Sequence, residues 1–118
     1  MKFALVISAA PEADLQPVQF AMALLAEGHT LTRVFFLREG VRHGEAGSPA
    51  AAAWLSLAGA GQMYELALCI SATERRHLQP VEHTAHHVGQ SAARFEVMGL
   101  GQLVDALEAA DRVIDFPG

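Results

Sequence analysis

Short apolar runs alternate with longer helix-like stretches along the whole chain. The runs at residues 3–7 (FALVI) and 31–37 (LTRVFFL) have the character of strands buried in a parallel sheet. Further runs of the same kind occupy residues 64–70, 95–98 and 112–116. The pattern therefore predicts about five strands.

Segments rich in good helix formers separate these runs. Pro17 fits an early helical position and Gly28 a C-terminal cap, while Ser48 and Pro49 form a cap and first-turn pair. Helices are predicted at residues 16–27, from 48 to about 59–61, from 71 to a break at Pro80, and at 102–110, with helix and loop at 81–93 and a turn-rich loop at 38–47.

This alternation predicts an α/β fold. Strands separated by helix-length segments pair in parallel through right-handed crossovers. We therefore expect a three-layer α/β/α sandwich on a mostly parallel sheet of about five strands, built as one domain over residues 1–118. The strand order does not follow from the pattern.

Composition and charge narrow the classes of partner. Apolar residues make up 52% of the 118 and the mean hydropathy is +0.24, which favours some apolar surface buried against other subunits. The formal net charge of −5 argues against direct binding of nucleic acid, which requires Lys and Arg to neutralise phosphates.

The chain has one cysteine, so no internal disulfide forms. The apolar start at residues 3–7 is too short for a signal peptide, and no stretch is long enough to cross a membrane. We expect a cytoplasmic, reducing location, in which a free thiol persists.

Cys69 is the candidate reactive group. It lies near the end of the third predicted strand, and active sites of open parallel sheets form at that end. Ser71 and Glu74 have the spacing of a capping box, which predicts a helix start beside the thiol. The helix N-terminus, with Arg75 or Arg76, would favour the thiolate. A buried, inert cysteine in an apolar strand is an equally good interpretation.

The absence of a second cysteine favours group carriage over thiol–disulfide exchange, because exchange uses a resolving partner. A cysteine hydrolase would need a histidine base, and the sequence does not choose among His29, His43 and His77.

Two other polar groups have both a functional and a plain interpretation. His83, with His86 and His87 at i+3 and i+4, shares one helical face and could bind a metal, although a solvated face is the favoured interpretation. Arg75 and Arg76 either bind an anion or a partner's carboxylates, or are solvated helix residues. No metal or cofactor is predicted.

Several segments, in chain order, resemble the DsrE/TusD family of sulfur-relay proteins. VFFLREGV at 34–41 is similar to the family's V-F-F-Y-R-E-G-V, and CISATERR at 69–76 to its active-site segment of a Cys, Ala-rich residues and Arg-Arg. The other matching segments are residues 1–5, 19–21, 28–29, 48–49, 99–103 and 110–113.

The resemblance implies a sulfurtransferase in which Cys69 accepts sulfane sulfur as a persulfide. It further implies a hetero-oligomer with TusB-like and TusC-like (DsrH/DsrF-like) subunits, a TusA-like donor and a TusE-like acceptor, in tRNA 2-thiouridine synthesis. A DsrE-like carrier in sulfur oxidation, a non-catalytic structural subunit and a homo-oligomeric assembly are the alternatives.

The chain also departs from the family pattern. His77 stands where the family has Gly after Arg-Arg, and residues 78–93 lack the family's acidic pattern. These departures bear on the partner surfaces more than on the thiol.

Overall fold

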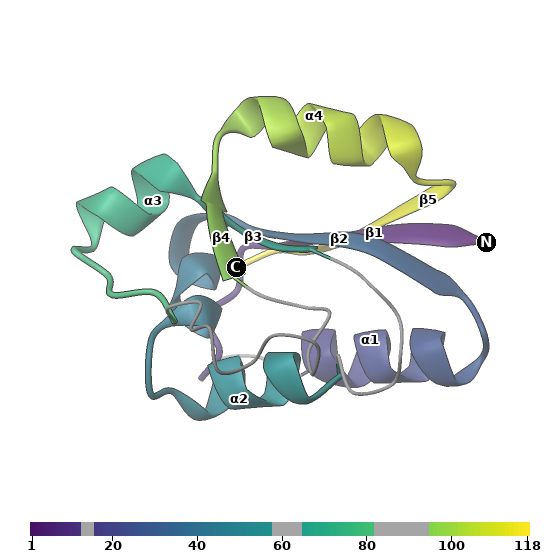
Figure 1. Cartoon of the computed structure of the whole chain (residues 1–118), viewed down its shortest axis with the longest axis horizontal. Helices are drawn as coiled ribbons and strands as arrows, with labels where there is room; N and C mark the ends of the chain where they lie inside the picture. The colour runs from purple at the N-terminus through teal and green to yellow at the C-terminus, as the bar shows by residue number, and fades with distance from the viewer. Residues whose placement is uncertain (13–15, 58–64, 82–94) are drawn as a thin grey trace, which may run out of the picture.

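The computed structural model describes residues 1–12, 16–57, 65–81 and 95–118. Its centre is a five-stranded sheet in the order β4-β3-β2-β1-β5, with every neighbouring pair parallel (Figure 1). The strands are β1 (Lys2–Ile7), β2 (Thr30–Phe36), β3 (Glu65–Cys69), β4 (Phe95–Met98) and β5 (Arg112–Phe116).

Helices cover both faces of this sheet. Helices α1 (Gln16–Ala26) and α2 (Pro49–Ser56) lie on one face and α4 (Leu100–Ala109) on the other (Figure 1). The short helix α3 (Ile70–Arg75) and the 3₁₀ helix η1 (Arg38–Gly44) lie at the edge where β2 and β3 end. The α/β/α sandwich expected from the sequence is confirmed.

The helix caps predicted at Ser48 and Gly28 are also confirmed. Ser48 is the N-cap of α2 and accepts a hydrogen bond from the Ala51 amide at 3.1 Å. Gly28 ends α1 at a φ of +84°, and the amides of Gly28 and His29 donate to the carbonyls of Leu25 and Leu24. These two bonds form a Schellman motif, which needs the left-handed conformation that glycine adopts readily.

Some helix and strand boundaries in the structure differ from those predicted from the sequence. Strands β4 and β5 match the predicted ranges, whereas part of the predicted loop at 38–47 forms η1. Helix α3 begins at Ile70 rather than Ser71 and ends at Arg75, well before Pro80, and α4 begins at Leu100 rather than Gln102. The predicted helix end at 59–61 and most of the 81–93 segment lie outside the described residues.

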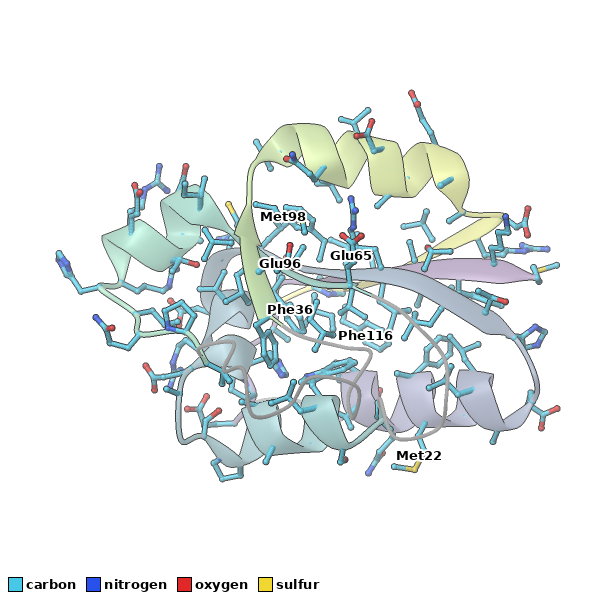
Figure 2. All side chains as sticks on the ribbon, viewed as in Figure 1. Met22, Phe36, Glu65, Glu96, Met98 and Phe116 are labelled. Atoms are coloured by element: carbon cyan, nitrogen blue, oxygen red, sulfur yellow. The ribbon has the colours of Figure 1, made fainter. Side chains whose placement is uncertain are left out.

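Two of the largest buried side chains, Trp54 and Phe36, pack against each other between the sheet and α2. Trp54 is fully buried, and Phe36 meets its ring edge-on at a centroid distance of 5.4 Å. In Figure 2, Phe36 and Phe116 point to the side of α1 and α2, while Glu65, Glu96 and Met98 lie on the α4 side. Trp54 is thus a core residue.

The α4 face is more thinly covered. Ala106 is the one buried residue of α4, while Leu100, Val104 and Leu107 are exposed at i, i+4 and i+7. This spacing places the three on one side of the helix. The apolar surface expected from composition is therefore present on α4. Within the described part of the chain, no helix is long and apolar enough to cross a membrane.

Candidate active site

Cys69 is the last residue of β3 and the N-cap of α3. The predicted position at the carboxyl end of a parallel strand, directly before a helix, is confirmed. The predicted capping box is wrong, because the helix starts at Ile70 and its N-cap side chain makes no hydrogen bond to the first turn. Ser71 and Glu74 consequently lie inside the helix.

Strand alternation places the thiol on the α4 face of the sheet. Side chains of β3 point in turn to opposite faces, so Cys69 shares the face of Glu65, which Figure 2 shows on the α4 side. Met98 of β4 is the register partner of Cys69 and lies on the same face (Figure 2). The thiol therefore sits beside a thioether, at the strand ends nearest the start of α4.

The thiol is mostly covered. Cys69 is 8% exposed, whereas Ile70, the next residue, is 44% exposed. The sequence left the exposure of Cys69 open, and burial is what the structure gives. Access of a sulfur donor to the thiol is therefore restricted in this structure.

The inner face of α3 continues from the cysteine. Ala72 and Thr73 are buried and Arg76 is partly covered, while Ser71 lies on the exposed side. Ala72 and Thr73 lie four and three residues before Arg76, so these three side chains follow one face of the helix. Thr73 was not among the residues singled out from sequence, since a threonine inside a helix carries no distinctive signal.

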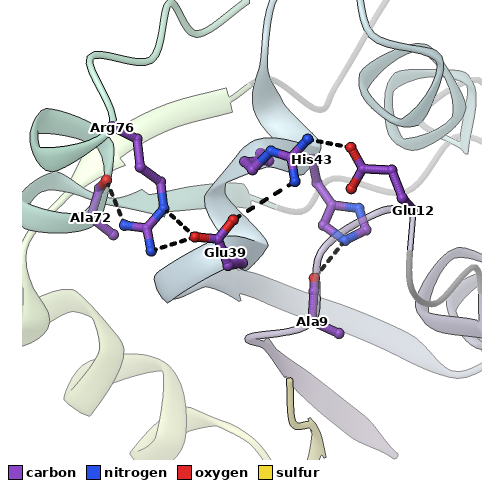
Figure 3. Close-up of polar contacts among 7 residues, drawn as sticks. Ala9, Glu12, Glu39, His43, Ala72 and Arg76 are labelled. Atoms are coloured by element: carbon purple, nitrogen blue, oxygen red, sulfur yellow. Dashed lines mark hydrogen bonds and ion pairs between the residues drawn. The ribbon is translucent and has the colours of Figure 1, made fainter.

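The two arginines lie at the opposite end of α3 from Cys69. Six helical residues span about 9 Å. Arg75 is exposed, and Arg76 forms an ion pair with Glu39 of η1 at 2.8 Å and donates to the Ala72 carbonyl at 3.1 Å (Figure 3). Arg76 thus tethers α3 to η1, and its predicted role in stabilising the thiolate remains a prediction.

A chain of ion pairs extends this tether. Arg42 lies 3.7 Å from Glu39 and also pairs with Glu12 in the loop after β1 (Figure 3). The pKa of Glu12 lies below its ordinary value. The larger cause is a hydrogen bond with the backbone, and the Arg42 guanidinium lowers the pKa further. Glu12, Arg42 and Glu45 also line a cavity of about 190 Å³ that Cys69 does not reach.

Of the histidines that the structure describes, neither His43 nor His29 supplies a base for Cys69. His43 is buried, accepts a hydrogen bond at Nδ1 from the Trp54 indole, and is paired through Nε2 with the Ala9 carbonyl at 3.1 Å. Its neutral, Nε2-protonated tautomer follows from these partners. His29 packs edge-on against Phe3 just before β2, at the opposite edge of the sheet. The hydrolase alternative therefore loses two of its three candidate bases.

His77 and Arg38 have positive φ angles of 48° and 52°. His77 follows α3, and the amides of His77 and Leu78 donate to the carbonyls of Glu74 and Thr73, which is a Schellman motif. That motif favours glycine at the position of His77, which accounts physically for the glycine expected there from the family pattern. Residues 82–94, with His83, His86 and His87, lie outside the described residues.

Comparison with known proteins agrees with this geometry. The model of the DsrE/DsrF-like family matches residues 1–116. The crystal structure of the ychN protein from E. coli superposes with a TM-score of 0.75 at 20% sequence identity, covering 98% of this chain and 99% of that one. This likeness shows a shared fold.

Curated relatives are more similar in sequence. The putative sulfurtransferase DsrE of Allochromatium vinosum is 36% identical over 98% of both chains. Sulfurtransferase TusD of Enterobacter sp. is 37% identical over 98% of this chain and all of its own length, and that of Photorhabdus laumondii 36% identical over 83% and 82%. The fold and the site thus place this chain in a class of α/β/α proteins that carry a single cysteine at the end of a strand. The chain belongs to the DsrE/DsrF-like family.

Proposed function

We propose that this protein is a sulfurtransferase that carries sulfane sulfur as a persulfide on Cys69. The observation that carries the proposal is the position of the only cysteine, at the carboxyl end of β3 and the start of α3, in a chain whose relatives over 98% of its length are named sulfurtransferases. A lone thiol suits a carrier, because the second thiol of each transfer belongs to another protein.

The transfer needs no external oxidant. The Cys69 thiolate attacks the outer sulfur of a donor persulfide, R–S–SH. A bond forms between Sγ and that sulfur, the donor S–S bond breaks, and its electron pair leaves on the donor thiolate R–S⁻. An acceptor thiolate later attacks the outer sulfur of the Cys69 persulfide and regenerates the Cys69 thiolate.

The proposal includes assembly of this protein with other protein subunits. The cover over Cys69 and the exposed apolar side of α4 both favour a subunit of a larger assembly. TusB-like and TusC-like subunits, a TusA-like donor and a TusE-like acceptor are the proposed partners, with wobble uridine thiolation in tRNA as the end product. The net charge of −5 agrees with an indirect role at the RNA. A free thiol carrier also fits a reducing cytoplasm.

The test is intact-protein mass spectrometry after incubation with glutathione persulfide. We expect the wild type to gain the mass of one sulfur atom, reversibly with dithiothreitol, and Cys69→Ser to gain none. A gain that persists in Cys69→Ser contradicts the proposal.

A non-catalytic structural subunit is the second candidate, and the 8% exposure of Cys69 is the observation that favours it. It predicts no sulfur gain and a thiol that resists iodoacetamide in the folded protein. Loading of the wild type excludes this role.

A further inference from the structure

The buried hydroxyl group of Thr73 stands out in the described part of the chain. The residue is 5% exposed, and its Oγ1 has no hydrogen-bond partner among the described residues. A buried hydroxyl group without a hydrogen-bond partner costs folding free energy, and few buried hydroxyl groups in native proteins lack a partner. A threonine that keeps an unused donor inside the protein therefore calls for a role.

The position of Thr73 relative to Cys69 suggests that role. Thr73 lies four residues after the cysteine, on the buried side of the helix whose N-cap is Cys69. One helical turn advances about 5.4 Å, so the hydroxyl lies roughly one turn from the thiol. In the unloaded protein this separation leaves Oγ1 and Sγ without a hydrogen bond.

A persulfide shortens the gap. The second sulfur extends about 2 Å beyond Sγ, which is the length of an S–S bond. We propose that the Thr73 hydroxyl donates a hydrogen bond to the outer sulfur of the Cys69 persulfide. This inference rests on the proposed function and makes Thr73 a residue that contacts the carried sulfur.

The hydrogen bond would act on the loaded state alone. Cys69 accepts the outer sulfur of R–S–SH as described, R–S⁻ departs, and the new persulfide Cys69–S–SH releases its proton to solvent to give Cys69–S–S⁻. A hydroxyl donor stabilises this anion, because hydrogen bonds to charged groups are the stronger ones. Loading becomes more favourable, and the persulfide ionises at lower pH.

The experiment compares the wild type with Thr73→Val, which keeps the shape and removes the hydroxyl, and with Thr73→Ser, which keeps the hydroxyl. Each protein is equilibrated with glutathione persulfide and glutathione at fixed ratios, and the loaded fraction is read by intact mass. We expect the loading equilibrium constant of Thr73→Val to fall about tenfold or more, and that of Thr73→Ser to stay near the wild type.

A pH profile separates this role from a packing role. The pH profile of the rate of sulfur transfer from the loaded protein to a small thiol should lie about one pH unit higher in Thr73→Val than in the wild type. Should that variant fail to fold, Thr73→Ala gives the same comparison with Thr73→Ser. Equal loading constants and superimposable pH profiles overturn the inference, whereas a wild type that gains no sulfur overturns the proposed function together with it.

Discussion

Among the described glycines, Gly40 is the one where replacement by alanine should destabilise the fold most. A Cβ at Gly40 would lie 2.0 Å from the Ile7 carbonyl oxygen and 2.8 Å from the Ile7 carbonyl carbon. Both atoms belong to the backbone at the end of β1, so no side-chain rotation relieves the contact. Helix η1 would have to move by roughly 1 Å, and overpacking of this severity costs about 3 kcal/mol. A fall in Tm of about 10 °C follows for Gly40→Ala.

Urea and thermal unfolding measure this effect, with Gly101→Ala as the matched control. A Cβ at Gly101 meets nothing within 4 Å, and replacing a helical glycine by alanine stabilises by up to about 1 kcal/mol. Because η1 is joined to α3 through Glu39 and Arg76, Gly40→Ala should also speed alkylation of Cys69. A free energy of unfolding for Gly40→Ala within about 0.5 kcal/mol of the wild type would refute the reasoning.

Two further substitutions test the surroundings of the thiol. His77→Gly should raise the free energy of unfolding by about 1 kcal/mol, because the φ of 48° at His77 suits glycine; His77→Ala, which keeps a Cβ, should not reproduce the gain. Thr73→Val should raise it by about 1 kcal/mol in urea unfolding of the unloaded protein, because an unpaired buried hydroxyl is replaced by a methyl group. A loss of stability in Thr73→Val would mean that the hydroxyl is paired.

Local sequence was sufficient for most of the fold. Alternation of apolar runs and helix formers defines β4 and β5 to the residue, and the caps at Ser48 and Gly28 depend on side-chain and backbone preferences that act within one turn. The position of Cys69 at a strand end followed from the same pattern. Each of these features is decided by neighbours in the chain.

The rest depends on contacts between distant segments. Arg76 was predicted to serve the thiol, yet its partner is Glu39, 37 residues earlier. The unpaired state of the Thr73 hydroxyl becomes visible only when α3 is packed in place. The strand order required the register of all five strands. Periodicity carries no information on such pairings.

We expect access to the thiol to depend on how firmly α3 is held. The helix is six residues long, too short to be stable alone, so its C-terminal Schellman motif and the Arg76–Glu39 pair matter more than in a longer helix. If reagents reach Cys69 through local opening of α3, the alkylation rate follows the opening equilibrium.

Removing the tether should therefore show in the rate. An ion pair of this exposure contributes at most about 1 kcal/mol, so Arg76→Gln should alkylate with iodoacetamide up to about fivefold faster than the wild type. Arg75→Gln is the matched control, because Arg75 is exposed, and it should leave the rate unchanged. Glu39→Gln should match Arg76→Gln, and the double variant should add little to either. Equal rates in Arg76→Gln and Arg75→Gln would mean that α3 does not open on its own, and that a partner must uncover the thiol.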